Sequence, residues 1–413
     1  MKVSTLRSFF SLLAIAAILC FAQMSFAVPL RELTPPGLAD GPGIWANIWN
    51  YPQGDLDAYC THLRNFGIRN IFIQTSRSNT AAIAHPEDLG KLIDACHRHK
   101  IRVIAWAYLE LSDPIADANK MLAAAHFRSP SGDSIDAIAP DLEKNLIDSR
   151  ISKFSQALRD DLGPHYPLIA VVYSPLNHYQ EVANTPWKTL ARYYDVIAPM
   201  SYWNSKYQKL DAHDYTLATV RTIRELTGRP DIEVHVIGDG MGTKGQSIQE
   251  FLKACRRAEA TSASIYPNQK VTEDQLAALS RYPDYFEPNA RFRLAAFREM
   301  LKSGAVEMPK GGDPAQPITR YDFLRMVAQH SRSPLAAPDA NDVAMSEPIR
   351  SDDAVNILAR IVDIQPVGQK KRRADRWFAP AASAAQTEQT GGSKPLNYLD
   401  AAQMVLQATS AIR

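Results

Sequence analysis

Two carboxylates stand two residues apart at the end of an apolar run, and their spacing suits acid–base chemistry. Asp141 lies at the end of the run 135–142 and Glu143 directly follows it, so a strand continuing through both would point the two side chains to one face. Like charges held close together raise the pKa of one partner, which then stays protonated near neutral pH. Such an acid can protonate the leaving oxygen of a glycosidic bond. The alternative is a pair of acids favoured by the amino end of the next helix.

Aromatic and polar residues gather at the ends of other apolar runs. Flat rings suit the apolar faces of sugars, while nearby polar groups take the hydroxyls. The alternative for about half of the aromatic residues is packing in the core, where aromatic side chains bury much of their surface. The residues that we expect to bind substrate are Trp49, Trp106, Tyr108, Glu110, Met200, Trp203, Asp239 and Tyr266.

The elements that must position these residues are short apolar runs alternating with amphipathic stretches. Continuous apolar strands separated by helices are typical of a buried parallel sheet. Eight such units predict an α/β protein, a (β/α)8 TIM barrel, in which the carboxyl ends of the strands form the mouth. A doubly wound open sheet is the rival, but no GxGxxG follows the first run. The predicted strands are 43–49, 68–74, 101–108, 135–142, 168–173, 196–202, 232–237 and 262–266.

Two of these segments carry family motifs. Residues 136–143 resemble the DxxDxDxE motif of the family 18 glycoside hydrolases, with Ala139 in place of the second acid. Residues 195–203 resemble that family's Met-x-Tyr-Asp motif, with Trp203 in place of the Asp. The resemblance is specific at these two segments and architectural elsewhere over 43–285.

The resemblance implies roles for three residues. Glu143 would be the general acid, Asp141 would orient and stabilise the N-acetyl group of the substrate, and Tyr202 would bond its carbonyl. For a sugar without an N-acetyl group a second protein carboxylate must act, and Glu110 and Asp239 are the candidates. We therefore expect a secreted glycoside hydrolase-like protein acting on a polysaccharide, and the alternative is a non-catalytic cell-envelope protein that binds polysaccharide through a degenerate barrel.

The carboxyl-terminal third carries a repeated pattern. The segments 317–326, 348–357 and 395–404 each have Pro, an aliphatic residue, an acid four residues on and an apolar residue four further. The acid falls where the first turn of a helix favours it, so each segment predicts a short helix. The first unit, from the predicted helix 293–303 through 318–323, resembles an S-layer homology domain, which implies attachment to a cell-wall polymer. The alternative is a helical appendage packed on the barrel.

These observations give a domain plan and a location. Lys2 and Arg7 precede an apolar run, and small residues end at Ala27, so 1–27 is expected to be a secretory signal peptide rather than a membrane anchor. The chain is expected outside the cytoplasm, secreted or in the cell envelope, with no transmembrane segment in the mature part. The remaining boundaries are a barrel over 28–287, a helical region over 288–368, a linker over 369–394 and a carboxyl-terminal helix over 395–413.

Composition excludes several other functions. With 46 basic and 44 acidic residues, the chain lacks the basic excess of a nucleic-acid binder, and an apolar fraction of 46% excludes global disorder. No histidine has the spacing of a metal site, and the glycine-rich stretch 238–245 lacks the order of a phosphate loop, so we expect neither metal nor cofactor. Cys60, Cys96 and Cys255 are expected to be buried small hydrophobic residues rather than a disulfide pair.

Overall fold

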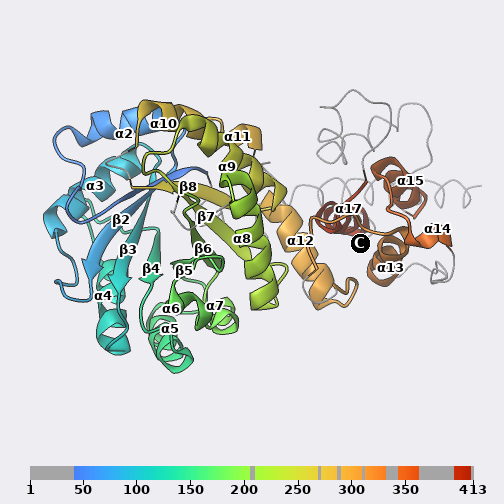
Figure 1. Cartoon of the computed structure of the whole chain (residues 1–413), viewed down its shortest axis with the longest axis horizontal. Coiled ribbons are helices and arrows are strands. Elements are labelled where there is room, and N and C mark those ends of the chain that lie inside the picture. The colour runs from blue at the N-terminus through green and yellow to red at the C-terminus, as the bar shows by residue number, and fades with distance from the viewer. Residues whose placement is uncertain are drawn as a thin grey trace, which may run out of the picture. The chain divides into compact units, whose positions relative to one another are not determined.

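The architecture is a closed barrel followed by helices. The computed structural model describes residues 41–204, 210–267, 271–285, 290–308, 312–331, 343–361 and 395–410. Each strand of the barrel pairs in parallel with the next, and the last pairs with the first, which confirms the predicted (β/α)8 barrel (Figure 1). The strands are β1 (Gly43–Ala46), β2 (Asn70–Arg77), β3 (Arg102–Leu109), β4 (Ala137–Leu142), β5 (Ile169–Tyr173), β6 (Val196–Ser201), β7 (Glu233–Asp239) and β8 (Ser262–Tyr266).

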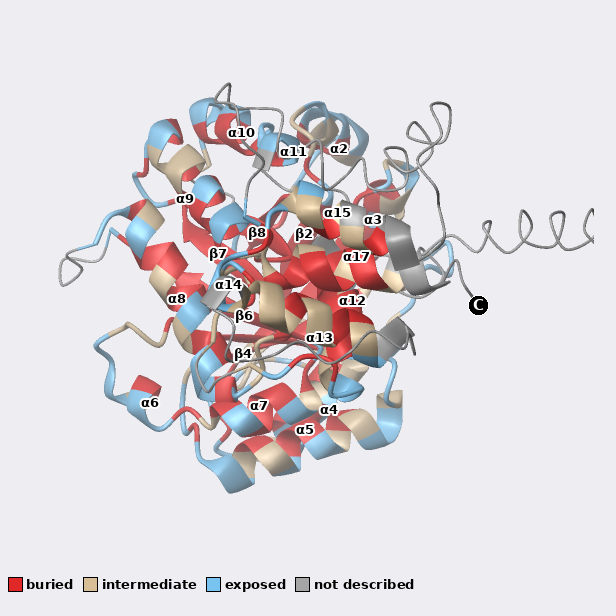
Figure 2. Cartoon of the chain, turned by 90° about the vertical axis from the view of Figure 1, so that its right-hand side faces the viewer, coloured by how far each residue is buried: buried red, intermediate tan, exposed pale blue. Residues whose placement is uncertain are grey.

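Helices connect the strands and cover the outside of the barrel. They are buried on one face and exposed on the other, as α5 and α8 show (Figure 2). Asp55, Asp113 and Asp211 cap the amino ends of their helices, as short polar side chains do. The helices that follow the strands of the barrel are α2 (Leu56–Asn65), α3 (Pro86–Arg98), α4 (Pro114–His126), α5 (Asp148–Leu162), α6 (Gln180–Ala183), α7 (Trp187–Tyr193), α8 (Ala212–Thr227), α9 (Gly245–Arg257), α10 (Glu273–Leu279) and α11 (Tyr282–Tyr285).

Some strands extend beyond the apolar runs where a neighbour offers pairing, whereas β1 ends at Ala46, before the run 43–49 does. The run 68–74 becomes the strand Asn70–Arg77, because pairing with β3 continues to Arg77 opposite Tyr108. This pairing shifts register between Gln74 and Ser76, the mark of a β-bulge. The bulge changes which residues of β2 face the barrel interior near the mouth.

The barrel interior is filled by side chains. Trp45 stacks on Phe72 with ring centroids 4.0 Å apart and planes 7° apart, and Trp106 meets Trp45 edge-on at 5.7 Å. Small residues that face the interior, such as Ala137 and Ala139 of β4, make room for these rings. The interior is thus a packed core rather than an open channel.

One histidine lies within this core. His235 is fully buried, with Nδ1 2.6 Å from Ser262 Oγ and Nε2 2.8 Å from Ser264 Oγ. Trp45 donates its indole N–H to the same Ser264 oxygen. Burial lowers the pKa of His235 to about 3, so the imidazole is neutral in the folded protein.

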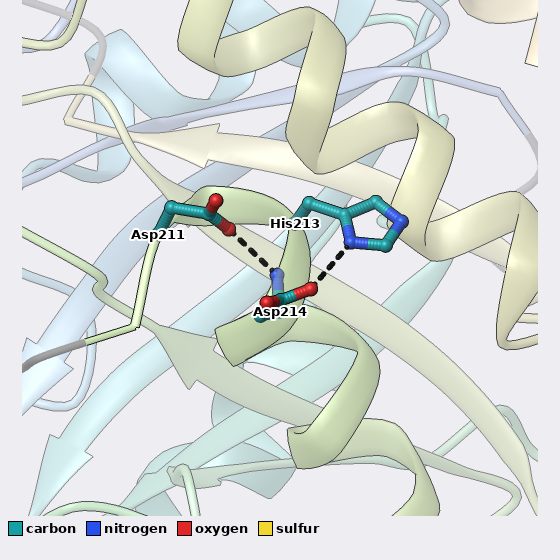
Figure 3. A group of neighbouring side chains, drawn as sticks. All are labelled: Asp211, His213 and Asp214. Atoms are coloured by element: carbon teal, nitrogen blue, oxygen red, sulfur yellow. Dashed lines mark hydrogen bonds and ion pairs between the residues drawn. The ribbon is translucent and has the colours of Figure 1, made fainter.

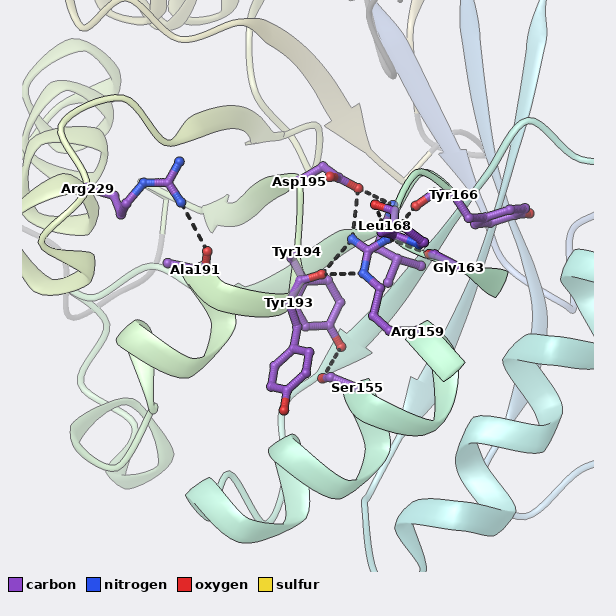
Figure 4. Close-up of polar contacts among 11 residues, drawn as sticks. Ser155, Arg159, Gly163, Tyr166, Leu168, Ala191, Tyr193, Tyr194, Asp195 and Arg229 are labelled. Atoms are coloured by element: carbon purple, nitrogen blue, oxygen red, sulfur yellow. Dashed lines mark hydrogen bonds and ion pairs between the residues drawn. The ribbon is translucent and has the colours of Figure 1, made fainter. Parts of the chain in front are cut away.

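An arginine holds together the amino ends of two strands, opposite the mouth. Arg159 of α5 donates hydrogen bonds to the backbone oxygens of Tyr193 and Tyr166 and pairs with Asp195 at 3.0 Å (Figure 4). Asp195 in turn accepts the backbone N–H of Leu168, just before β5. Tyr194 and Ser155 join α5 to the chain entering β6. These contacts fix α5 against β5 and β6.

The chain divides into two compact units, and the second contains the three repeated segments. Ile318 donates its backbone N–H to Leu396, Leu396 to Ile349, and Ile349 to Ile318, so the three segments close a ring of backbone hydrogen bonds. All three aliphatic residues are buried. The helices of this unit are α12 (Ala290–Lys302), α13 (Arg320–Ser331), α14 (Val343–Ser346), α15 (Ser351–Ile361) and α17 (Tyr398–Ser410).

The acid of each repeat is held by a side chain from elsewhere in the unit. Asp353 pairs with Arg320, and Asp400 pairs with Arg293. The remaining acid, Asp322, accepts the phenol of Tyr398 at 2.6 Å. The pattern found in the sequence therefore marks acids that tie the three segments to one another, through Asp322 and Asp353, and to α12, through Asp400.

The expectations about the cysteines, a membrane span, the signal peptide and the linker have different outcomes. The three cysteines are buried and free, as expected, with the sulfurs of Cys60 and Cys96 3.7 Å apart. None of the described helices has the length and hydropathy needed to cross a membrane. The signal peptide expected over 1–27 and the linker over 369–394 lie outside the described residues.

Candidate active site at the barrel mouth

A cavity of about 310 Å³ opens among the carboxyl ends of the strands. Half of its lining residues are aromatic, and the others include two acids, one arginine and two amides. The lining residues are Trp45, Trp49, Gln74, Arg77, Trp106, Tyr108, Asp141, Glu143, Val171, Tyr173, Asn177, Tyr179, Met200, Tyr202, Ile237 and Tyr266. This composition suits a ligand with apolar faces and hydroxyl edges.

Strand β4 delivers the two acids. Its residues alternate, so that Ala137, Ala139 and Asp141 share the interior face and Glu143 follows just beyond the strand. Asp141 is buried, and its Oδ1 has no hydrogen-bond partner among the described residues. Burial raises the pKa of Asp141 well above its usual range, and the neighbouring Glu143 adds to the effect.

Glu143 is tied to the neighbouring strand. Its carboxylate accepts a hydrogen bond from the phenol of Tyr173, at the end of β5. Burial raises the pKa of Glu143, while the Tyr173 bond and the positive charges of Lys144 and Arg77 act in the opposite direction. The two acids interact directly, so they titrate as a pair that keeps one shared proton more readily than either acid would alone.

A phenol just beyond β6 completes the expected constellation. Tyr202 lines the same cavity as the acids, and its ring lies 6.3 Å from that of Tyr266. Burial raises the pKa of Tyr202 well above its usual value, with Tyr266 and the two acids adding to the effect, so its hydroxyl stays protonated as a donor. The structure thus brings Asp141, Glu143 and Tyr202 to one cavity, as the sequence predicted.

Five of the expected substrate-binding residues line the cavity with them. Trp49 is 68% exposed and offers an open ring face, whereas Trp106 is nearly buried and donates its N–H to the backbone oxygen of Ala46. These two rings therefore differ in what they offer a ligand. The five residues are Trp49, Trp106, Tyr108, Met200 and Tyr266.

The other three expected residues are not among those that line the cavity. Trp203 packs against Phe251 of α9, 5.3 Å between ring centroids, on the outside of the barrel. Glu110 lies at the exposed end of β3, where its backbone bonds Ser78 and Asn145. The alternation that would turn Glu110 inward ends with β3 at Leu109.

Asp239 is buried, but it serves the loop after β7. Its Oδ1 accepts the backbone N–H of Met241 at 2.8 Å, and Asn204 also bonds it. Gln275 of α10 holds the same loop through the backbone oxygens of Gly240 and Thr243. A side chain at Gly240 would meet Tyr266 O at 2.8 Å, so glycine is needed for this close approach. Asp239 is therefore a loop-stabilising residue.

The surroundings of Ala139 explain why this position does not carry the acid of the motif that the strand resembles. Ala139 faces the apolar barrel interior opposite Trp106, in direct register with it. A carboxylate there would be buried among aromatic rings without a partner. Asp136, the first acid of the motif, lies at the other end of the strand, where it accepts bonds from His97 and the Val103 backbone.

Eight lining residues were not among the predicted site residues, and Gln74, Arg77 and Asn177 are the three of them with charged or amide side chains. Gln74 and Arg77 come from β2 on either side of the bulge, so simple alternation does not assign both to one face. Nε2 of Gln74 is buried and has no partner among the described residues. An unexplained polar residue in an apolar run was the available signal for Gln74, whereas Asn177 lies in a loop without a recognisable pattern.

One group of side chains within the described ranges has the spacing of metal ligands. Asp211, His213 and Asp214 lie at the start of α8 (Figure 3). Asp211 accepts the backbone N–H of Asp214, and His213 pairs with the Asp214 carboxylate at 2.8 Å. Helix capping and this ion pair account for the cluster, and it lies apart from the cavity lining.

Comparisons with known proteins show a likeness in fold. No family model matches the chain, and no curated protein matches its sequence. Among solved structures, the ICChI chitinase of Ipomoea carnea is 14% identical with a TM-score of 0.43, covering 59% of this chain and 99% of its own. A putative chitinase A of Streptomyces coelicolor is 12% identical with a TM-score of 0.44, over 60% and 99%.

A third solved structure is the spore cortex-lytic enzyme SleL of Bacillus cereus. It is 10% identical, with a TM-score of 0.46, and the match covers 60% of this chain and 74% of SleL. At these identities and TM-scores the similarity does not extend to activity.

Proposed function

We propose that this chain is a glycoside hydrolase-like enzyme that acts on a polysaccharide containing N-acetylhexosamine, with Glu143 as the general acid. The observation that carries the proposal is the buried acid pair Asp141–Glu143 in an aromatic cavity. Burial and mutual repulsion favour one retained proton, which is what a general acid needs near neutral pH.

The chemistry follows from the positions of the three residues. Glu143 donates its proton to the glycosidic oxygen as the bond to the anomeric carbon breaks. The acetamido oxygen of the same sugar attacks that carbon, while Asp141 accepts the acetamido N–H and Tyr202 donates to the carbonyl. Water then opens the cyclic intermediate, and Glu143 takes a proton from it.

The carboxylates of the cavity support this substrate-assisted route. Among the described lining residues, Asp141 and Glu143 are the only acids. Glu110 and Asp239, the candidates for a protein nucleophile, lie outside the lining. A nucleophile supplied by the substrate removes the need for a further carboxylate.

Substitution of the proposed general acid by its amide tests the proposal. Glu143→Gln should lower turnover of an N-acetylhexosamine oligosaccharide by roughly a hundred- to ten-thousand-fold, because it removes the transferable proton. Glu110→Gln is the matched control, since this exposed acid lies outside the cavity, and its turnover should equal that of the wild type. Unchanged turnover in Glu143→Gln would reject the assignment of the acid.

A non-catalytic polysaccharide-binding protein is the second candidate. It is favoured by the Tyr173 bond, which stabilises the ionised form of Glu143, and by Ala139 and Trp203 at the positions of family acids. If purified wild type binds N-acetylhexosamine oligosaccharides but releases no reducing ends from any of them, this second function replaces the first.

Export and wall attachment belong to the same proposal. The signal-peptide pattern of 1–27 supports a location outside the cytoplasm, and the S-layer-like pattern of the second unit supports binding of a cell-wall polymer. Co-sedimentation of the full chain with purified cell-wall polysaccharide tests the attachment. Absence of the full chain from the pellet would reject it.

A further inference from the structure

We propose that the glycan bound in the mouth carries a carboxylate, and that Arg77 binds this group. The inference rests on the proposed binding of a polysaccharide, but it does not require that the polysaccharide be cleaved. The ligand would then contain an acidic sugar, either a hexuronic acid or a hexosamine bearing a lactyl ether.

The β2 bulge places Arg77 in the cavity lining. Register shifts after Gln74, and pairing then resumes with Arg77 opposite Tyr108. Thr80 fixes the backbone at this point, because its Oγ1 accepts the Arg77 N–H at 2.8 Å. Arg77 is therefore anchored at the mouth by both strand pairing and a turn.

Two aromatic rings hold the guanidinium. Its Cζ lies 4.6 Å from the centroid of the Tyr108 ring and 5.3 Å from that of Trp49. Contacts of this kind stabilise the cation and limit the directions in which it can point. They also remove part of its hydration, so a bound anion meets a guanidinium that is already oriented.

The donors of Arg77 are left open. Within the ranges that the structure describes, its side chain makes neither a hydrogen bond nor an ion pair, whereas Arg159, Arg229 and Arg293 all pair with acids. The acids of the cavity lie close enough for Arg77 to lower the pKa of both, yet no ion pair forms with either. A guanidinium serving only to neutralise Asp141 and Glu143 would bond them directly.

The free donors fit a carboxylate. The planar guanidinium binds carboxylates through two parallel hydrogen bonds, a geometry that lysine does not provide. The exposed ring of Trp49 beside it offers a stacking face for the sugar that carries the anion. Ring, cation and acid pair line one cavity, so a single oligosaccharide can contact all three.

Binding measurements on the full chain test the inference without depending on catalysis. The Glu143→Gln variant is titrated calorimetrically with two acidic probes, alternating N-acetylhexosamine–hexuronic acid oligomers and lactyl-bearing N-acetylhexosamine oligomers. Each probe is paired with the same oligomer after reduction of its carboxylate to an alcohol. We expect at least one acidic probe to bind roughly ten- to a hundred-fold more tightly than its reduced partner, the range for hydrogen bonds to a charged group. The probe that shows this preference identifies the source of the carboxylate.

Substitutions at Arg77 test whether this residue causes the preference for the acidic probe over its reduced partner. Arg77→Gln should abolish the preference, and Arg77→Lys should retain part of it through charge alone. Lys144→Gln is the matched control, because this exposed cation next to Glu143 pairs with Glu181, and its preference should be unchanged. The melting temperature of each variant shows whether it has folded.

The outcomes separate this inference from the proposed hydrolysis. Equal binding of acidic and reduced probes, a preference that survives Arg77→Gln, or no binding of either acidic probe would overturn the role of Arg77. A preference that depends on Arg77 in a protein that never cleaves the probes supports the inference and rejects only the hydrolase activity.

Discussion

The phenol of Tyr173, at the end of β5, donates a hydrogen bond to the carboxylate of Glu143, just beyond β4. The bond joins adjacent strands at the point where the proposed acid must hold and release a proton. It favours the ionised form of Glu143, so it opposes the effect of burial on the pKa of that group.

Removal of this phenol should shift the pH dependence of activity. In Tyr173→Phe the ionised form of Glu143 loses a donor, so the pKa of Glu143 rises. Because the general acid acts when protonated, the alkaline limb of the kcat profile should move to higher pH. Tyr193→Phe, which removes a hydroxyl bonded to Gln156 on a partly buried ring far from Glu143 in the sequence, is the control. A limb that stays in place, or moves to lower pH, would contradict the assigned role of the bond.

Lowering the pH should destabilise the barrel, because His235 is buried in its neutral form. Its folded-state pKa of about 3 lies below the unfolded value of about 6.5, so between these values only the unfolded chain binds the proton. The stabilising contribution of neutral His235 is complete above pH 6.5. As pH falls toward 3, the free energy of unfolding should decrease by about 1.4 kcal/mol per unit.

Urea titrations of wild type and His235→Gln across pH 4–7 would measure this slope. The variant should be less stable at neutral pH, and its free energy of unfolding should fall less steeply with acid. Equal slopes in the two proteins would show that His235 does not dominate the acid response.

Loss of Arg159 should lower the stability of the barrel at the amino ends of β5 and β6. Arg159→Met keeps the aliphatic stem but leaves the backbone oxygens of Tyr193 and Tyr166 and the Asp195 carboxylate without this partner. We expect the free energy of unfolding to fall by about 3 kcal/mol or more, because several partly buried acceptors lose a charged donor. Chemical denaturation measures the change. Arg98→Met, which breaks an exposed pair with Asp57, should have little effect.

Introduction of an acid at position 139, where the motif that this strand resembles has one, should cost stability rather than add activity. Ala139→Asp would bury a carboxylate beside Trp45 and Trp106, at an expected cost of about 3–5 kcal/mol. Ala81→Asp places the same side chain in an exposed loop and should be nearly neutral. A thermal-unfolding comparison checks both. An active Ala139→Asp protein with unchanged stability would show that the interior accommodates an acid.

The ring of three segments should behave as one folding unit. Deletion of 395–413 removes Leu396, which accepts from Ile318 and donates to Ile349. The buried Ile318 and Ile349 then lose a neighbour, so we expect the calorimetric transition of this unit to disappear while that of the barrel remains. Gln403→Ala on α17 is the control, and it should keep both transitions. Persistence of both transitions after the deletion would show that the first two segments suffice.

The sequence alone determined the barrel and the acids of its mouth. Periodic apolar runs report which segments are buried on both faces, and alternation on β4 puts Asp141 and Glu143 on one side of the strand. Tyr202, Trp106, Tyr108 and Tyr266 were found in the same way, because the carboxyl ends of all barrel strands meet at one mouth.

The tertiary structure decided which side chains reach the cavity, where the alternation of residues along a strand does not. The β2 bulge turned Arg77 into the cavity, the packing of Trp203 against Phe251 removed it from the cavity, and Asp239 was taken up by its own loop. Each outcome depends on which neighbour a side chain meets across strands or helices far apart in the sequence. A period of two residues specifies the face of a strand, but only the assembled barrel specifies the partner on that face.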